Sequence, residues 1–207
     1  MGLLALLVLA GFLAVTSVAF RSSRAIPPQR IALIGDSITD QARDVYQTEL
    51  PPAYTLDIEA VPGRRFVDML PLAREAAAAR PNQVVIDLGS NDVLLDEPDE
   101  STDQAMGTML DLYATTPCVH VVTVNEGFVF APTQGPKARR INDQLRRIAT
   151  ERGYRIVDWN KIVVDYVAAG APQGPITADS VHPTAVGKSM LVDAVRASLA
   201  ACRGSRS

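Results

Sequence analysis

Apolar runs that alternate with helical patterns constrain the fold of this chain more than any other feature of its sequence. The runs "QVVIDLG" (83–89) and "CVHVVTV" (118–124) are nearly continuous in Val, Ile and Leu, as strands buried on both faces of a sheet are. We expect strands near residues 30–35, 55–61, 83–88, 118–124 and 154–158. Helical periodicity falls near residues 40–49, 66–80, 101–115, 135–152, 160–169 and 183–201. This alternation predicts an α/β fold in which crossover helices join parallel strands.

The length of the chain suits a single domain that follows an apolar leader. It has 207 residues, and residues 3–20 carry no charge. A run of this length predicts a signal peptide or an N-terminal membrane anchor over residues 1–20. We expect residues 21–29 to be a linker, residues 30–202 to form the one domain and residues 203–207 to be a tail.

The leader leaves the location of the domain open. A cleaved or anchoring segment predicts a protein that is secreted or faces the cell envelope, with the membrane as a partner if the segment is uncleaved. The cations after the apolar run, at Arg21, Arg24 and Arg30, favour a cytoplasmic orientation instead.

Charge and cysteine content narrow the partners further. The formal net charge of −3, with cations scattered among acidic residues, argues against nucleic acid as a partner. No CxxC or HExxH spacing occurs, so we expect no metal and no cofactor. Cys118 and Cys202 form either one disulfide in an oxidising compartment or two buried thiols.

Polar residues cluster where the predicted strands end. Ser37 follows the first strand in "IALIGDSITD", Gly63 follows the second and Asn91 follows the third. The carboxyl ends of parallel strands line the crevice in which open α/β sheets bind ligands. We therefore expect these residues to lie around one site.

Ser37, His182 and Asp179 are the candidates for nucleophilic catalysis. A serine hydroxyl becomes a good nucleophile when an imidazole accepts its proton and a carboxylate orients that imidazole. Asp179 lies three residues before His182, so a single turn can bring the two side chains together. The other histidine, His120, alternates with valines and is predicted to be a buried strand residue. Backbone N–H groups of Ser37 and Gly63 and the side-chain amide of Asn91 are the candidate donors to an oxyanion.

Four motifs in this order resemble those of one family. "GDSIT", "VPGRRF", "GSNDV" and "DSVHPT" are similar to the four blocks of the SGNH, or GDSL-type, hydrolases and fall within residues 31–187. The resemblance implies a flavodoxin-like, three-layer α/β/α fold with a parallel five-stranded sheet. It also implies that Ser37 is the nucleophile, that Asp179 and His182 complete a catalytic triad, and that Gly63 and Asn91 are oxyanion donors.

Three functions are compatible with these residues. The first is a serine hydrolase that cleaves carboxylic esters of lipids, carbohydrates or small molecules through an acyl-enzyme on Ser37. The second is an acyltransferase that uses the same residues, and the third is a catalytically silent binding module. Phe128 and Phe130 lie in a predicted loop over the crevice, where they either contact an acyl chain or pack the loop against the domain.

The acidic stretch "DVLLDEPDEST" (92–102) has the composition of a surface loop. Ser101 and Thr102 are typical N-cap residues, so we expect one of them to cap the helix that follows.

Overall fold

Five parallel strands form one sheet in the computed structural model, which describes residues 29–128, 132–172 and 174–204. The strand order is β2-β1-β3-β4-β5. The strands are β1 (Gln29–Gly35), β2 (Tyr54–Ala60), β3 (Gln83–Asp87), β4 (Cys118–Val122) and β5 (Arg155–Val157). All five strands predicted from the sequence are present within one or two residues of the expected bounds.

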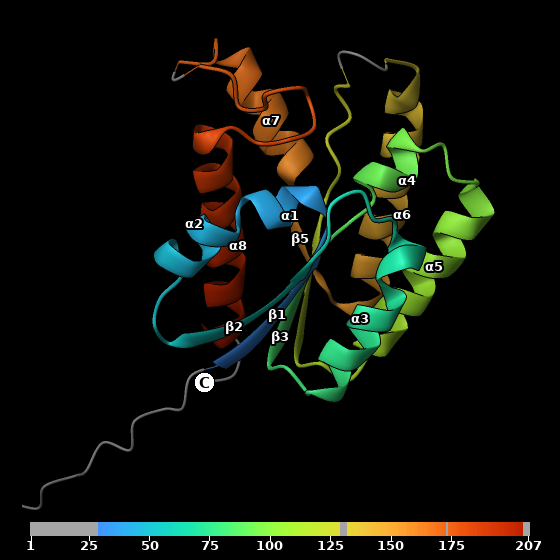
Figure 1. Cartoon of the computed structure of the whole chain (residues 1–207), viewed down its shortest axis with the longest axis vertical. Coiled ribbons are helices and arrows are strands. Elements are labelled where there is room, and N and C mark those ends of the chain that lie inside the picture. Colours follow the sequence, from blue (N-terminus) through green and yellow to red (C-terminus); the bar gives the residue numbers. More distant parts are fainter. Residues whose placement is uncertain (1–28, 129–131, 173, 205–207) are drawn as a thin grey trace, which may run out of the picture.

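Helices cover both faces of this sheet (Figure 1). One face carries α2 (Arg43–Glu49) and α8 (Ala185–Gly204), with α7 (Trp159–Ala168) in contact with α8. The opposite face carries α3 (Phe66–Ala78), α5 (Asp99–Leu112) and α6 (Gly135–Arg152). The predicted three-layer α/β/α fold is confirmed.

Two short helices lie where the central strands end, in the upper half of Figure 1. They are α1 (Ser37–Gln41), directly after β1, and α4 (Ser90–Leu94), after β3. The sequence reading missed α4 and treated its residues as part of a loop. The expected cap at Ser101 or Thr102 is also wrong, because α5 begins at Asp99 with Pro98 as its N-cap residue.

The register of the central strands sets the geometry of the carboxyl edge. Gly35 of β1 pairs with Asp87 of β3, so the two strands end level with each other. Every residue of β3 is buried, as its nearly continuous apolar sequence predicted. The segments that leave these two strands therefore start side by side from a rigid base.

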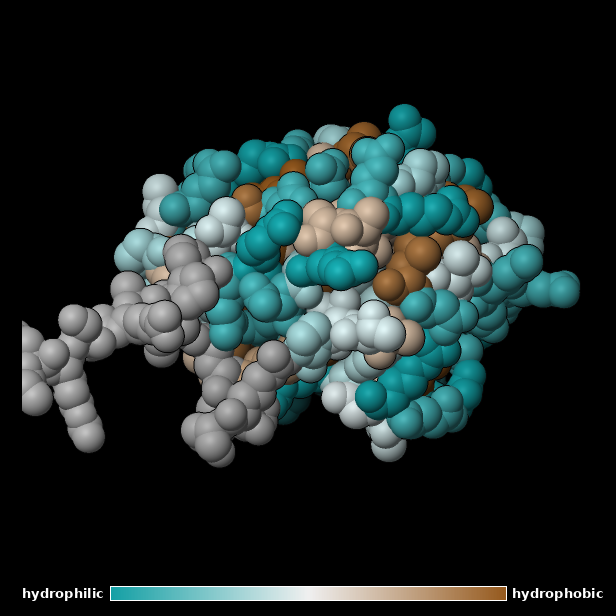
Figure 2. Space-filling view, turned by 90° about the horizontal axis from the view of Figure 1, so that it is seen from below, coloured by the Kyte–Doolittle hydropathy of each residue, from teal (hydrophilic) through white to brown (hydrophobic). Residues whose placement is uncertain are grey.

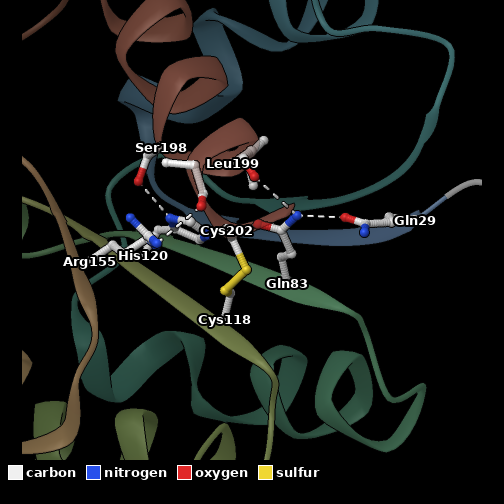
Figure 3. The surroundings of a disulfide bond; sticks show 9 residues. Gln29, Gln83, Cys118, His120, Arg155, Ser198, Leu199 and Cys202 are labelled. Atoms are coloured by element: carbon white, nitrogen blue, oxygen red, sulfur yellow. Dashed lines mark hydrogen bonds between the residues drawn. A yellow bond between two sulfur atoms is a disulfide. The ribbon is translucent and has the colours of Figure 1, made fainter. Parts of the chain in front are cut away.

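The amino ends of the strands are tied to α8 by a disulfide and a hydrogen-bond network (Figure 3). Cys118 of β4 and Cys202 of α8 form the disulfide, with Cα atoms 6.4 Å apart. His120 is fully buried, as predicted, with Nδ1 2.7 Å from Ser198 Oγ and Nε2 2.9 Å from Gln83 Oε1. Cys118, Cys202, His120, Ser198 and Gln83 are called the amino-end cluster below.

The predicted leader (residues 1–20) and all of the predicted linker except Gln29, which begins β1, lie outside the described residues. Of the predicted tail, residues 205–207 also lie outside them, and α8 extends to Gly204. Among the helices that the structure describes, none is both long enough and apolar enough to cross a bilayer. Figure 2 shows the molecule from below, where hydrophilic residues cover most of the face and hydrophobic ones form small separate groups. Scattered apolar residues of this kind are ordinary on a folded domain.

Candidate active site

Ser37 is the first residue of α1, immediately after β1. Asp36 is the N-cap residue, and its Oδ1 accepts a hydrogen bond from Ile38 N at 2.9 Å. The turn needs glycine at position 35, because a Cβ there would lie 2.3 Å from Thr39 Oγ1. The motif "GDSIT" thus places the Ser37 hydroxyl at the carboxyl edge of the sheet, on a side chain that is held by a short buried helix.

Ser37, His182 and Asp179 form a continuous chain of hydrogen bonds. Ser37 Oγ lies 2.9 Å from His182 Nε2, and His182 Nδ1 lies 2.7 Å from Asp179 Oδ2. A carboxylate can only accept, so Nδ1 carries a proton and Nε2 accepts the Ser37 hydroxyl proton. The three residues that the sequence suggested for nucleophilic catalysis are therefore brought together across 145 positions of the chain.

Asp179 is held in its ionised form. Burial raises its pKa, but hydrogen bonds from His182 and Val181 outweigh that effect and hold the pKa below its usual value. The backbone N–H groups of His182 and Val181 both donate to Asp179 Oδ1, at 2.7 and 3.0 Å. A single tight turn thus supplies both the carboxylate and its stabilisation.

Asn125 anchors this turn and was missed in the sequence. It lies just after β4, is buried, and its Nδ2 donates to the carbonyl of Ser180 at 2.7 Å. Ser180 adopts a positive φ of 62°, a conformation that is costly for a residue other than glycine. The signal was available, since Asn125 is a polar residue directly after a predicted strand.

Asn91 lies in α4 with its amide directed at two acceptors. Its Nδ2 donates to Asp36 Oδ2 at 2.9 Å and to the carbonyl of Arg64 at 3.2 Å. Gly89 precedes α4 with a φ of 116°, and a Cβ there would lie 2.9 Å from Val124 Cγ2. Asn91 is thereby fixed beside the residue that precedes Ser37.

Gly63 lies in the exposed turn between β2 and α3. Its φ of 76° is in the left-handed region that favours glycine, and a Cβ would meet no atom within 4 Å. The next carbonyl along the chain, that of Arg64, contacts the Asn91 amide. The turn that contains Gly63 therefore borders Asn91, while the role of Gly63 as an oxyanion donor stays a prediction.

Three buried carboxyl groups lie behind these residues and are called the carboxylate cluster here. They are Asp36, Asp87 and Asp92, and none of them forms an ion pair with a cation in the described part of the chain. Burial raises the pKa of all three, and the charge of Asp87 raises that of Asp36 further. Thr39 Oγ1 donates to Asp87 at 2.8 Å, and Phe66 N donates to Asp92 at 3.2 Å.

No metal centre emerges from these groups. Across residues 29–128, 132–172 and 174–204, no three His, Cys, Asp or Glu side chains are grouped so that they could hold a metal ion.

Two aromatic side chains were expected over the crevice. Phe128 is buried in the hydrophobic core, which matches the packing alternative, and its contact with a substrate stays a prediction. Phe130 lies outside the described residues.

The two arginines after Gly63 differ in their surroundings. Arg65 forms ion pairs with Asp68, at 2.9 Å, and with Glu97, so its guanidinium is occupied within the protein. Arg64 is exposed.

The motifs and their geometry place the chain in a known family. Residues 33–189 match the model of the GDSL-like lipase/acylhydrolase family, which is most of the chain. The protein belongs to this family, as its four sequence motifs predicted. No match to a curated protein was found.

Several solved structures share the fold of this chain. An acetyl xylan esterase superposes with a TM-score of 0.68 at 19% identity, covering 81% of this chain and 98% of its own. An acetylxylan esterase from Geobacillus stearothermophilus gives a TM-score of 0.67 at 16% identity, over 84% of this chain and 94% of its own. The C-terminal catalytic domain of peptidoglycan O-acetyltransferase A from Streptococcus pneumoniae gives 0.64 at 20% identity, over 87% and 97%. At these identities the likeness establishes the fold.

Proposed function

We propose that this protein is a serine esterase that cleaves carboxylic esters through an acyl-enzyme on Ser37. The observation that carries the proposal is the hydrogen-bonded chain from Ser37 Oγ through His182 to Asp179. Family membership supports the same class of reaction. The substrate class is an acyl or acetyl ester of a carbohydrate, a lipid or a small molecule.

The reaction proceeds in two halves on this arrangement. Ser37 Oγ attacks the ester carbonyl carbon while its proton passes to His182 Nε2, and the carbonyl π electrons move onto the oxygen. The ionised Asp179 stabilises the imidazolium that forms. The C–O bond to the alcohol then breaks, and the alcohol leaves with the proton from His182. Water repeats the sequence on the acyl-enzyme and releases the carboxylic acid.

The tetrahedral oxyanion needs donors that face Ser37. In this proposal they are the backbone N–H groups of Ser37 and Gly63 and the side-chain amide of Asn91. The second amide N–H of Asn91 now contacts the Arg64 carbonyl at 3.2 Å, a longer contact than the 2.9 Å to Asp36. The oxyanion would take the place of the Arg64 carbonyl on this N–H.

Labelling and turnover test the proposal together. A fluorophosphonate probe should modify wild-type protein at Ser37, identified by peptide mapping, and nitrophenyl acetate should be hydrolysed. Ser37→Ala should lose both properties, whereas Ser198→Ala should keep both. Folded wild-type protein that neither reacts with the probe nor releases nitrophenol would overturn the proposal. A series of longer nitrophenyl esters then gives the acyl-chain preference.

An acyltransferase would use the same acyl-enzyme. The likeness to the fold of an O-acetyltransferase domain is the reason to test this alternative. Turnover with added alcohol or sugar acceptors decides between the two. Transfer predicts an acylated acceptor at the expense of free acid, and hydrolysis predicts free acid throughout.

The disulfide supports an oxidising location for the domain. Disulfides persist outside the cytosol, in secreted proteins and in the cell envelope. We therefore propose that the domain lies in such a compartment, which a leader over residues 1–20 that is cleaved or serves as an anchor would also predict. Fractionation of cells that express the full chain, followed by blotting for the domain, tests this location.

A further inference from the structure

We propose that Asp36 is a positioning residue of the oxyanion hole, because its buried carboxyl group accepts a hydrogen bond from the Asn91 amide and keeps the amide nitrogen available to the oxyanion. This inference rests on the proposed ester chemistry and extends it to a residue that does not touch the reacting atoms. The observation that carries it is the 2.9 Å hydrogen bond from Asn91 Nδ2 to Asp36 Oδ2.

An asparagine amide has two nearly isosteric orientations, in which its nitrogen and oxygen exchange places. Only one of them offers donors to an oxyanion. At Asn91 both N–H groups face oxygen acceptors, which are Asp36 Oδ2 and the Arg64 carbonyl. In this structure Asp36 Oδ2 accepts from Asn91 and Oδ1 accepts from Ile38 N, so a flipped amide, whose oxygen would face Oδ2, loses this hydrogen bond.

The Asp36 contact is the stronger of the two constraints. Asn91 Nδ2 lies 2.9 Å from Asp36 Oδ2 and 3.2 Å from the Arg64 carbonyl, so the hydrogen bond to Asp36 is the shorter of the two. Asp36 is only 1% exposed, so water cannot compete for its oxygens. Arg64 instead lies on an exposed turn, and its carbonyl accepts at 3.2 Å.

Asp36 is itself held in one position by the fold. Its other oxygen accepts from Ile38 N at the start of α1, the helix that begins with Ser37. One carboxylate therefore connects the segment that carries the nucleophile to the helix that carries Asn91. Burial and the neighbouring charge of Asp87 raise the pKa of Asp36 to about 8, and the hydrogen bonds from Ile38 N and the Asn91 amide partly offset that rise.

Replacement of Asp36 by asparagine is the sharpest test, because it removes the acceptor and preserves the size. In Asp36→Asn the new Oδ1 can still cap α1 by accepting from Ile38 N. Its NH₂ group would then face the NH₂ group of Asn91, so the Asn91 amide must rotate and present its oxygen to the site. Asp87→Asn is the matched control: it also removes a carboxylate of the cluster, and it keeps an acceptor for Thr39 without any contact to Asn91.

The rate of fluorophosphonate labelling reports the donor set directly. In that reaction Ser37 Oγ bonds to phosphorus, fluoride leaves, the serine proton passes to His182, and the phosphoryl oxygen occupies the oxyanion hole. Asp36→Asn should slow labelling and kcat for nitrophenyl acetate by about 10-fold or more, with KM nearly unchanged. Asp87→Asn should stay within about threefold of the wild type, and both variants should show wild-type circular dichroism.

A double variant separates positioning from an independent effect. If Asp36 acts through Asn91, then Asp36→Asn combined with Asn91→Ala should be no slower than Asn91→Ala alone, within about threefold. Rate losses that multiply in the double variant would overturn the inference, as would wild-type labelling by Asp36→Asn.

An NMR measurement tests the same contact without any turnover. The side-chain amide signals of Asn91 in ¹⁵N-labelled protein should shift in Asp36→Asn and stay in place in Asp87→Asn. Unchanged Asn91 signals in Asp36→Asn would refute the positioning role even in an active enzyme. Wild-type protein that is neither labelled nor active would instead refute the proposed function and leave the NMR result to decide the contact.

Discussion

The protein has two histidines, and each lies within hydrogen-bond distance of a serine hydroxyl at opposite ends of the same sheet. His182 lies 2.9 Å from Ser37 at the carboxyl edge, and His120 lies 2.7 Å from Ser198 in the amino-end cluster. In each histidine the ring nitrogen that does not face the serine donates to an oxygen, which is Asp179 Oδ2 for His182 and Gln83 Oε1 for His120. The nitrogen that faces the serine therefore carries no proton and accepts a hydrogen bond from the serine hydroxyl. The local hydrogen-bond pattern is therefore the same.

The surroundings of the two pairs differ in charge and access. His182 has an ionised carboxylate to stabilise its protonated form, and its side chain is 31% exposed. His120 is fully buried with only a neutral amide beyond it, and burial together with the charge of Arg155 lowers its pKa to about 4. A serine beside a histidine thus becomes a nucleophile only where an imidazolium can form and a substrate can reach it.

The largest contrast is expected when the two serines are replaced in turn. Ser37→Ala should lower kcat/KM for nitrophenyl acetate by at least about 10⁴-fold, because it removes the hydroxyl on which the acyl-enzyme forms. Ser198→Ala should leave kcat/KM within about twofold and cost about 1 kcal/mol of unfolding free energy, the usual value of one hydrogen bond. If Ser37→Ala and Ser198→Ala lost activity equally, Ser37 could not be distinguished from Ser198 as the nucleophile.

Replacement of the side-chain amides of Asn91 and Gln83 should give a smaller contrast in activity. Asn91→Ala should lower kcat by about 10² to 10³-fold with KM nearly unchanged, the typical effect of one oxyanion donor. Gln83→Ala should keep kcat and lower the unfolding free energy, since its amide bridges His120, Gln29 and Leu199 inside the fold (Figure 3). Steady-state kinetics and urea titration on both variants test this, and a full-rate Asn91→Ala enzyme would contradict it.

Loss of the disulfide should affect stability alone. Cys118 and Cys202 are 84 residues apart, and a disulfide typically stabilises a fold by about 2 to 4 kcal/mol. The double variant Cys118→Ala/Cys202→Ala should lose that amount in a urea titration and keep kcat/KM at 25 °C. A large drop in kcat/KM without unfolding would show that the amino-end cluster acts on the site.

Asp92 at the carboxyl edge and His120 in the amino-end cluster should change the pH dependence of stability in opposite directions. Burial raises the pKa of Asp92 in the fold from 3.8 to about 6, so the folded protein binds more protons than the unfolded chain between these values. Its contribution to stability is complete below pH 3.8 and is lost as the pH rises through about 6. Asp92→Asn should therefore reduce the loss of unfolding free energy between pH 4 and pH 8 by about 1 to 3 kcal/mol. Asp193→Asn, at an exposed ion pair, should not change that loss.

His120 should act in the other direction. Its pKa falls from 6.5 to about 4 on folding, so its contribution is complete above pH 6.5 and is lost as the pH falls through about 4. His120→Gln should reduce the acid-side loss of unfolding free energy by about 1 to 2 kcal/mol, measured by urea titration at pH 4.5 and pH 7. If the difference in unfolding free energy between pH 4.5 and pH 7 stays unchanged in His120→Gln, the loss at acid pH does not come from His120.

The strand pattern and the four motifs were readable because each is local. Val- and Ile-rich runs predicted all five strands, and "GDSIT" and "DSVHPT" pointed to Ser37, Asp179 and His182. The helix α4 was missed, because five residues are too few to display a helical period, and α5 begins after Pro98 rather than at a serine or threonine cap.

The sequence by itself determined the alternation of strands and helices, the family and the residue types of the site. Only the tertiary structure decided that His120 faces Ser198, that Cys118 pairs with Cys202, and that Asp36 and Asn125 hold Asn91 and the His182 turn. Periodicity and turn chemistry act over a few residues and leave a trace in the sequence. Hydrogen bonds between segments that lie 55 or 145 positions apart depend on strand order and register, which no short stretch of the chain encodes.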